Sequence, residues 1–224
     1  MIKKLEKKLS IESWLYLILI CLMGAFSPGP SLIVILRHAV ADGRSAGIYA
    51  AVGHGLGIFI YALVSAIGLS FILISSPKIF SFVQILGALF LLWIGFQILR
   101  EGLSKKDFTN FGEYKTSSSG ITLNHFRDGF GIAILNPKIL AFFSSLFSQF
   151  LSPEQNFSIH MFMAVIAGFI DVGVYVIIVF LVTLKSLLKF YKDKIFFVEV
   201  AFGLLLILLG FSIFVVSFNL TYFG

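Results

Sequence analysis

Hydrophobic residues lie in six long stretches, separated by shorter polar or basic segments. Each stretch is close to or above the roughly 20 apolar residues that a helix needs to cross a hydrocarbon core of about 30 Å. Backbone polar groups inside a bilayer must be satisfied, and the alternation typical of β-strands is absent, so we expect helices. The pattern predicts an all-α integral membrane protein of about six transmembrane helices. The stretches lie near residues 14–36, 46–74, 80–99, 129–151, 158–184 and 195–218.

Prolines interrupt the first and fourth stretches. A proline lacks an N–H and clashes with the carbonyl four residues back, so it frees a backbone carbonyl, such as that of Ala133. Freed carbonyls are tolerated at membrane depth only inside protein or facing water, and transporters build sites from such broken helices. One proline kink can serve packing alone, but two breaks favour a functional site. The residues at these breaks are Pro28, Gly29, Pro30 and Ser31 in the first stretch, and Asn136, Pro137 and Lys138 in the fourth.

Each half of the chain begins with one of the two interrupted stretches. Residues 1–99 form a first three-helix repeat with a basic N-terminal tail, 100–128 a cytoplasmic loop, and 129–224 a second three-helix repeat. An odd number of spans in each repeat inverts the second copy. We therefore expect two inverted three-helix repeats with broken first helices and a site between them.

The second and fifth stretches carry polar residues. Gly53 and Gly57 match the small-xxx-small pattern of close helix contacts, and His54 lies on the same stretch. His54 is either a polar contact in that interface or a pathway residue that titrates near neutral pH. Asp171 in the fifth stretch costs roughly 2.5–3.5 kcal/mol to insert, so it needs a partner or a water-filled cavity. Lys138 is the candidate counter-charge, either in a structural ion pair or beside a carboxylate that accepts protons.

The basic residues predict an orientation. Eleven Lys and Arg residues lie in the connections after the first, third and fifth stretches, and only Lys78 lies in the others. The positive-inside rule puts the first set in the cytoplasm and the C-terminus outside. Four lysines near the N-terminus conflict with six full spans. A first stretch that enters and turns back at its prolines would keep them inside, and both versions stay open.

Composition excludes several classes. Only 12% of the residues are charged, against about 25% in soluble domains, so a soluble fold is excluded. The net charge is +6, and its Lys and Arg residues lie in short runs beside the apolar segments. This placement is typical of membrane loops and does not indicate nucleic acid binding. The single cysteine, Cys21, allows no internal disulfide, and no nucleotide-binding glycine loop is present. We expect no cofactor and no metal.

Two other function classes remain as alternatives. A membrane-embedded enzyme could use His54 and Asp171 as acid and base, but the chain has neither His-Glu-x2-His nor Gly-x-Ser-x-Gly. A channel or metal exporter is disfavoured because carboxylate rings and Cys/His clusters are missing from the sequence.

Several short motifs occur at fixed spacings along the chain. They are Ser27-Pro28-Gly29-Pro30, Gly43-Arg44-x2-Gly47, Gly53-His54-x2-Gly57, Gly87-Ala88-x2-Leu91-x3-Gly95, Phe126-x2-Gly129-Phe130, Leu135-Asn136-Pro137-Lys138 and Gln149-Phe150. Together these motifs resemble those of the LysE/RhtB family of amino-acid exporters. Asp171 also stands where family members commonly have an aspartate in the fifth span. The chain departs from the family at Ser31, where an Asn is frequent, and before Gln149, where many members have a proline.

The resemblance implies a secondary active exporter of amino acids or their derivatives in the bacterial cytoplasmic membrane, and not an enzyme. Its partners would be the amino acid, membrane lipid and a coupling proton or other ion, and a homo-oligomer is left open. By alternating access, the substrate carboxylate would meet the half-helix start near Ser31 or the Lys138 ammonium. Carbonyls near Gly24, Phe26 and Ala133 would receive the substrate ammonium, and Asp171 would exchange protons.

Overall fold

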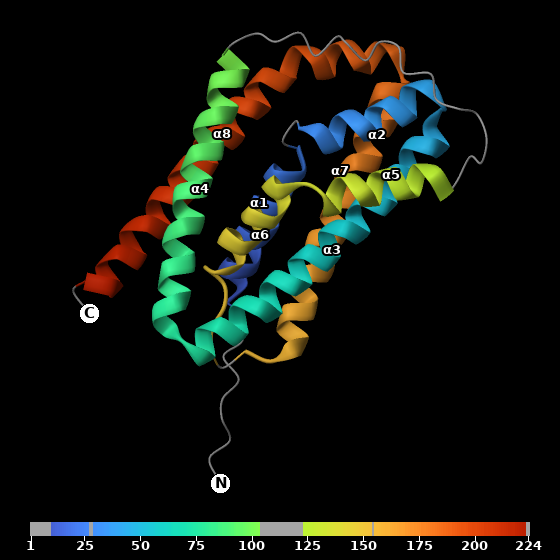
Figure 1. Cartoon of the computed structure of the whole chain (residues 1–224). Coiled ribbons are helices and arrows are strands. Elements are labelled where there is room, and N and C mark those ends of the chain that lie inside the picture. The colour runs from blue at the N-terminus through green and yellow to red at the C-terminus, as the bar shows by residue number, and fades with distance from the viewer. Residues whose placement is uncertain (1–9, 27–28, 104–122, 154, 223–224) are drawn as a thin grey trace.

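The computed structural model describes residues 10–26, 29–103, 123–153 and 155–222 (Figure 1). Within these ranges the regular structure is entirely α-helical, which confirms the predicted fold class. The helices are α1 (Ile11–Phe26), α2 (Pro30–Ala41), α3 (Arg44–Ser75), α4 (Pro77–Leu103), α5 (Leu123–Ile134), α6 (Pro137–Phe147), α7 (Phe157–Thr183) and α8 (Lys185–Tyr222).

Four of the predicted stretches are single helices, and two are bent pairs. Each of α3, α4, α7 and α8 contains a segment long and apolar enough to cross a membrane. The first stretch is divided into α1 and α2, whose axes differ by 60°, and the fourth into α5 and α6, which differ by 58°. The described residues therefore hold four candidate spans, or six if each bent pair counts as one. The breaks fall at the prolines, as predicted.

Two segments that we expected to be connections are helical. The basic run 185–194 is the beginning of α8, since it holds no proline or glycine and lysine is a good helix former. Residues 123–128, assigned to the cytoplasmic loop, form the first turns of α5. Of the remaining loop, residues 104–122 lie outside the described ranges.

The helices pack in layers around the two bent pairs (Figure 1). α4 lies along α8, and α3 packs against both α7 and α5. α1 packs against α7, and α6 against α3 and α4, while α2 and α5 contact each other and α3. In Figure 1 both α1 and α6 lie between the α4–α8 pair and α3. Each half of the chain thus consists of a bent pair followed by two long helices.

Glycines bring α3 and α5 into close contact. A Cβ atom added to Gly53 would lie 2.1 Å from the carbonyl oxygen of Phe126. A Cβ added to Gly129 would lie 1.9 Å from the carbonyl oxygen of Ala50. No side chain fits at either distance, so the two backbones touch directly. This confirms the small-residue interface predicted for the second stretch.

The outer faces of the long helices are covered by large apolar side chains. Soluble monomers rarely expose contiguous apolar patches of more than a few hundred Å². An apolar outer surface on spanning helices faces lipid instead, which agrees with the membrane assignment. Exposed examples are Phe71, Trp93, Phe96, Phe169, Leu208 and Phe211.

Candidate functional site

A cavity lies where the two bent pairs meet. It encloses about 590 Å³ of space that no atom fills, including its opening. Residues of α1, α2, α3, α6, α7 and α8 contribute to its wall, which is apolar except for a few polar and charged groups. Small-molecule sites commonly combine such a wall with a few placed polar groups. The polar and charged side chains that line it are those of Ser31, His54, Asn136, Lys138, Asp171 and Tyr175.

Asn136 connects the two helix breaks. It precedes Pro137 and has the extended backbone expected of that position, with φ −89° and ψ 106°. Its Oδ1 accepts the backbone N–H of Lys138 at 3.0 Å, which caps α6. Its Nδ2 donates to Oγ of Ser31 at 3.2 Å, in the first turn of α2. A single side chain therefore holds the starts of both half-helices together at the cavity.

The starts of α2 and α6 carry positive partial charge toward this region. Both helices begin with a proline, Pro30 and Pro137, whose missing N–H would have no helical partner at that position. The N-terminus of a helix carries roughly half a positive charge, and its free N–H groups bind anions well. Since Pro30 and Asn136 both line the cavity, a carboxylate placed there would be stabilised.

A buried His–Asp pair lies on the other side of the cavity. Nδ1 of His54 on α3 lies 2.7 Å from Oδ2 of Asp171 on α7, and both side chains are buried. When the carboxylate is ionised, it accepts the Nδ1 proton, and Nε2 of His54 keeps a lone pair. That Nε2 is buried and has no hydrogen-bond partner among the described residues. An unsatisfied buried polar group of this kind costs about 1–3 kcal/mol.

Lys138 brings a cation to the same cavity. Its Nζ lies 5.5 Å from the ring centre of Phe202 on α8, within the range of a cation–π contact. The same Nζ lies 3.9 Å from where a Cβ on Gly29 would be, which places the ammonium in van der Waals contact with the first break. We expected Lys138 to be the counter-charge of Asp171, and the structure gives that carboxylate His54 as a hydrogen-bonded partner.

The carbonyls at the second break have partners within the protein. Pro137 has no N–H to donate to the carbonyl of Ala133. That carbonyl instead accepts the backbone N–H of Asn136 at 3.3 Å. The next carbonyl, that of Ile134, accepts the hydroxyl of Tyr61 on α3. The expectation that the Ala133 carbonyl is freed for a substrate ammonium is therefore wrong, because the chain turns tightly enough to satisfy it locally.

The structure brings most of the predicted site residues together. Gly53 and Gly57 do not line the cavity, and a Cβ on Gly57 would lie 2.5 Å from the Cβ of Ala133 on α5. Pro137 begins α6 without lining the cavity, and Pro28 lies outside the described residues. The predicted residues that line the cavity are Gly29, Pro30, Ser31, His54, Asn136, Lys138 and Asp171.

Several cavity residues were not predicted. Tyr175 lies one helical turn after Asp171, and its ring centre is 4.9 Å from that of His54. The spacing of four residues on one helix was the signal that could have added it to the site. The aromatic wall formed by Phe142 and Phe202 gave no signal, because phenylalanines occur throughout the spans.

Replacing Asn136 with alanine should disturb the site through the tie between the breaks. Asn136→Ala removes a helix cap, at a cost of about 1 kcal/mol, and also the contact with Ser31. Asn156→Ala is the matched control, because Asn156 caps α7 outside the cavity by accepting the N–H of Ile159. We expect similar losses of thermal stability, and a raised KM for transport in Asn136→Ala alone. Equal KM values would contradict the role of this contact.

The fold and the cavity define a class of protein. Spanning helices that break at a central cavity, with ionisable side chains inside the spans, are typical of membrane transporters. The chain belongs to the family of LysE type translocators, whose family model matches residues 22–217. It is therefore a multi-pass membrane protein of a transporter family. No solved structure matches the chain.

Several curated relatives are amino-acid efflux proteins by name. A leucine efflux protein of Enterobacter sp. (strain 638) is 28% identical over 145 residues, 63% of this chain and 64% of the relative. A threonine efflux protein of Salmonella typhimurium is 28% identical over 131 residues, or 58% and 62% of the two chains. A leucine efflux protein of Klebsiella pneumoniae is 27% identical over 124 residues, or 55% and 56%. The chain thus matches less than two thirds of the length of these relatives.

Proposed function

We propose that this protein is a secondary active exporter of neutral amino acids, driven by protons and working by alternating access. One observation carries the proposal: Lys138, Asp171 and His54 line one cavity where two broken helices meet. A cation and a carboxylate in one small cavity complement the two charges of a zwitterion. The names of the relatives support leucine and threonine as the first substrates to test.

Each end of the substrate has a matching group. The substrate carboxylate binds near the Lys138 ammonium and the starts of α2 and α6, where positive partial charge converges. The substrate ammonium binds toward Asp171. The apolar side chain then contacts the wall formed by residues such as Ile58 and Phe142. Burial of that side chain adds about 25 cal/mol for each Å² of apolar surface removed from water.

Proton coupling follows from the cost of a buried charge. Asp171 is buried, and an uncompensated charge within a span is expensive. The His54–Asp171 pair can be neutralised by a proton or by the substrate ammonium, and the two compete for one place. A site that releases its proton when substrate binds, and takes one up when substrate leaves, exchanges protons moving inward for amino acid moving outward.

Alternating access is supported by the order of the helices. Both halves consist of a bent pair and two long helices, and corresponding members pack together as α3 with α7 and α4 with α8. We infer that residues 1–99 and 129–224 are inverted repeats that rock about the cavity.

The location and orientation complete the proposal. We infer that the protein lies in the bacterial cytoplasmic membrane with its C-terminus outside, in accordance with the distribution of Lys and Arg. The α2–α3 turn at Asp42–Gly43 and the loop before α5 are then on the cytoplasmic side.

Purified protein in liposomes loaded with labelled leucine or threonine tests the function. We expect saturable counterflow, and faster efflux when the outside is made acidic, because protons entering drive substrate out. A protonophore should remove the acceleration and leave counterflow intact. Non-saturable leakage would indicate a pore, and a chemically altered product would indicate an enzyme; either result would contradict the proposal. An exchange that ignores the pH gradient would contradict proton coupling alone.

A further inference from the structure

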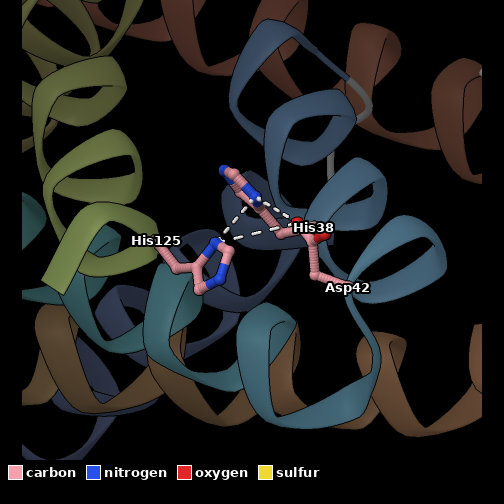
Figure 2. A group of neighbouring side chains, drawn as sticks. All are labelled: His38, Asp42 and His125. Carbon is pink, nitrogen blue, oxygen red and sulfur yellow. Dashed lines mark hydrogen bonds and ion pairs between the residues drawn. The ribbon is translucent and has the colours of Figure 1, made fainter. Parts of the chain in front are cut away.

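A second cluster of ionisable side chains lies outside the cavity, where α2 meets α5 (Figure 2). It consists of His38 on α2, Asp42 at the end of α2, and His125 on α5. Both histidines are buried, and none of the three residues lines the cavity. Nδ1 of His38 lies 3.0 Å from Nδ1 of His125, and Oδ2 of Asp42 lies 3.6 Å and 4.0 Å from these two atoms.

We propose that this cluster binds a divalent transition-metal ion of the zinc type, with His38, His125 and Asp42 as ligands. The three separations fix the position of such an ion. A circle through these two nitrogens and the oxygen has a radius of about 2.1 Å, the length of a zinc–nitrogen or zinc–carboxylate bond. An ion at its centre lies in the plane of the three ligand atoms, and a small shift of the Asp42 carboxylate toward the two histidines lifts the ion out of that plane, as tetrahedral geometry requires.

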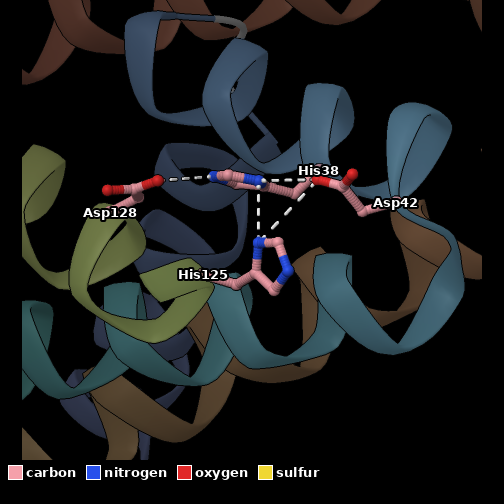
Figure 3. Close-up of polar contacts among 4 residues, drawn as sticks. All are labelled: His38, Asp42, His125 and Asp128. Carbon is pink, nitrogen blue, oxygen red and sulfur yellow. Dashed lines mark hydrogen bonds and ion pairs between the residues drawn. The ribbon is translucent and has the colours of Figure 1, made fainter. Parts of the chain in front are cut away.

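Asp128 supplies an independent observation (Figure 3). Its Oδ2 lies 3.1 Å from Nε2 of His38, on the opposite side of the ring from the three converging atoms. Histidines that bind metal almost always donate their second N–H to a carboxylate or a carbonyl. This contact places a proton on Nε2 of His38 and leaves the Nδ1 lone pair directed at the proposed ion.

The donor set selects the metal. Without an ion, a single proton between the two Nδ1 atoms satisfies the histidines, and the Asp42 carboxylate then faces the lone pair of His38. A divalent cation accepts both nitrogens and the oxygen at once. Two imidazoles and one carboxylate suit zinc or cobalt, whereas magnesium and calcium prefer oxygen ligands alone. Three protein ligands leave the fourth tetrahedral position to water.

The position of the site gives it a mechanical effect. His38 and Asp42 belong to the bent pair of the first half, and His125 and Asp128 to that of the second. A bound ion therefore cross-links α2 to α5 and holds this end of the molecule closed. Metal binding is expected to raise the melting temperature of the protein, because the folded state binds the ion and the unfolded chain does not offer this geometry.

Cobalt and zinc titrations of the full chain in nanodiscs, without an affinity tag, test the site. We expect CoCl2 to give the strong visible absorption of a tetrahedral ion, and ZnCl2 to displace it at one ion per chain. Asp128→Asn should weaken zinc binding by about 10- to 100-fold, because His38 loses its orienting partner. His125→Asn and Asp42→Asn should abolish the visible band. His160→Asn, which removes a buried histidine of α7, should leave it unchanged.

The wild-type spectrum alone can overturn the proposal, whether or not a variant folds. No binding at one ion per chain would show that the cluster holds no ion, and a spectrum of six-coordinate cobalt would contradict the tetrahedral site. Binding that survives equally in Asp42→Asn and His125→Asn would place the ion elsewhere. Neither result bears on amino-acid export, which depends on a separate set of residues.

Discussion

Asp171→Asn is expected to abolish proton-driven export and to weaken substrate binding by about 30-fold or more. Asparagine has the shape of aspartate and can still bond to His54, so the helices should pack as before. It carries no charge for the substrate ammonium, and truncating a buried charge pair costs at least about 2 kcal/mol. It also has no carboxylate to take up a proton. Efflux under an imposed pH gradient in liposomes, compared with protein-free liposomes, measures the loss.

Two further variants define what this loss means. Glu12→Gln removes an exposed carboxylate from the first turn of α1, outside the cavity, and should transport as the wild type does. His54→Gln keeps a hydrogen-bonding group beside Asp171 but removes the imidazole, so it should slow proton-driven efflux more than counterflow. Wild-type efflux by Asp171→Asn would remove this residue from coupling and from ammonium binding together.

Gly129→Ala is expected to destabilise the fold more than any other single methyl addition on α5. Its Cβ would lie 1.9 Å from the carbonyl oxygen of Ala50, a backbone atom that cannot turn aside. The helices would have to separate, and overpacking of this kind costs on the order of 3 kcal/mol. Thermal unfolding in detergent, followed by size-exclusion chromatography, should show a lower melting temperature and aggregated protein.

Gly131→Ala provides a control two residues away on the same helix. A Cβ at Gly131 meets nothing within 4 Å, and alanine favours a helix over glycine by about 1 kcal/mol. This variant should be as stable as the wild type or slightly more stable. If both variants unfolded at the same temperature, the close contact of α3 and α5 would not stabilise the folded protein.

Features that depend on one segment of the chain could be predicted from the sequence. Apolar length predicts the spanning helices, because the bilayer sets the length that each needs. Pro30 and Pro137 fix where the two broken stretches divide, since neither can donate a helical hydrogen bond. The Gly53–Gly57 spacing predicts a close helix contact through geometry within a single helix. The prediction that the basic run 185–194 is a connection is wrong, because charge alone does not end a helix.

Features that depend on which faces meet could not be predicted. His54 and Asp171 are separated by 117 positions, and no pattern in either stretch predicts that these two helix faces pack against each other. Opposite charge alone pairs Asp171 with Lys138, whereas the structure gives Asp171 a hydrogen bond with His54. His38 and His125 are 87 positions apart, so the spacing rules that reveal metal ligands within one segment could not find them.

The contact surface of α3 has a consequence for biosynthesis. Gly53 and Gly57 of this first-half helix are covered by α5, a helix of the second half. Before α5 is made, no helix covers these two glycines, and lipid tails are expected to contact them. The closing step of assembly is then the expulsion of lipid by α5, within the membrane and after insertion. A variant that blocks this step would accumulate as an inserted but protease-sensitive intermediate.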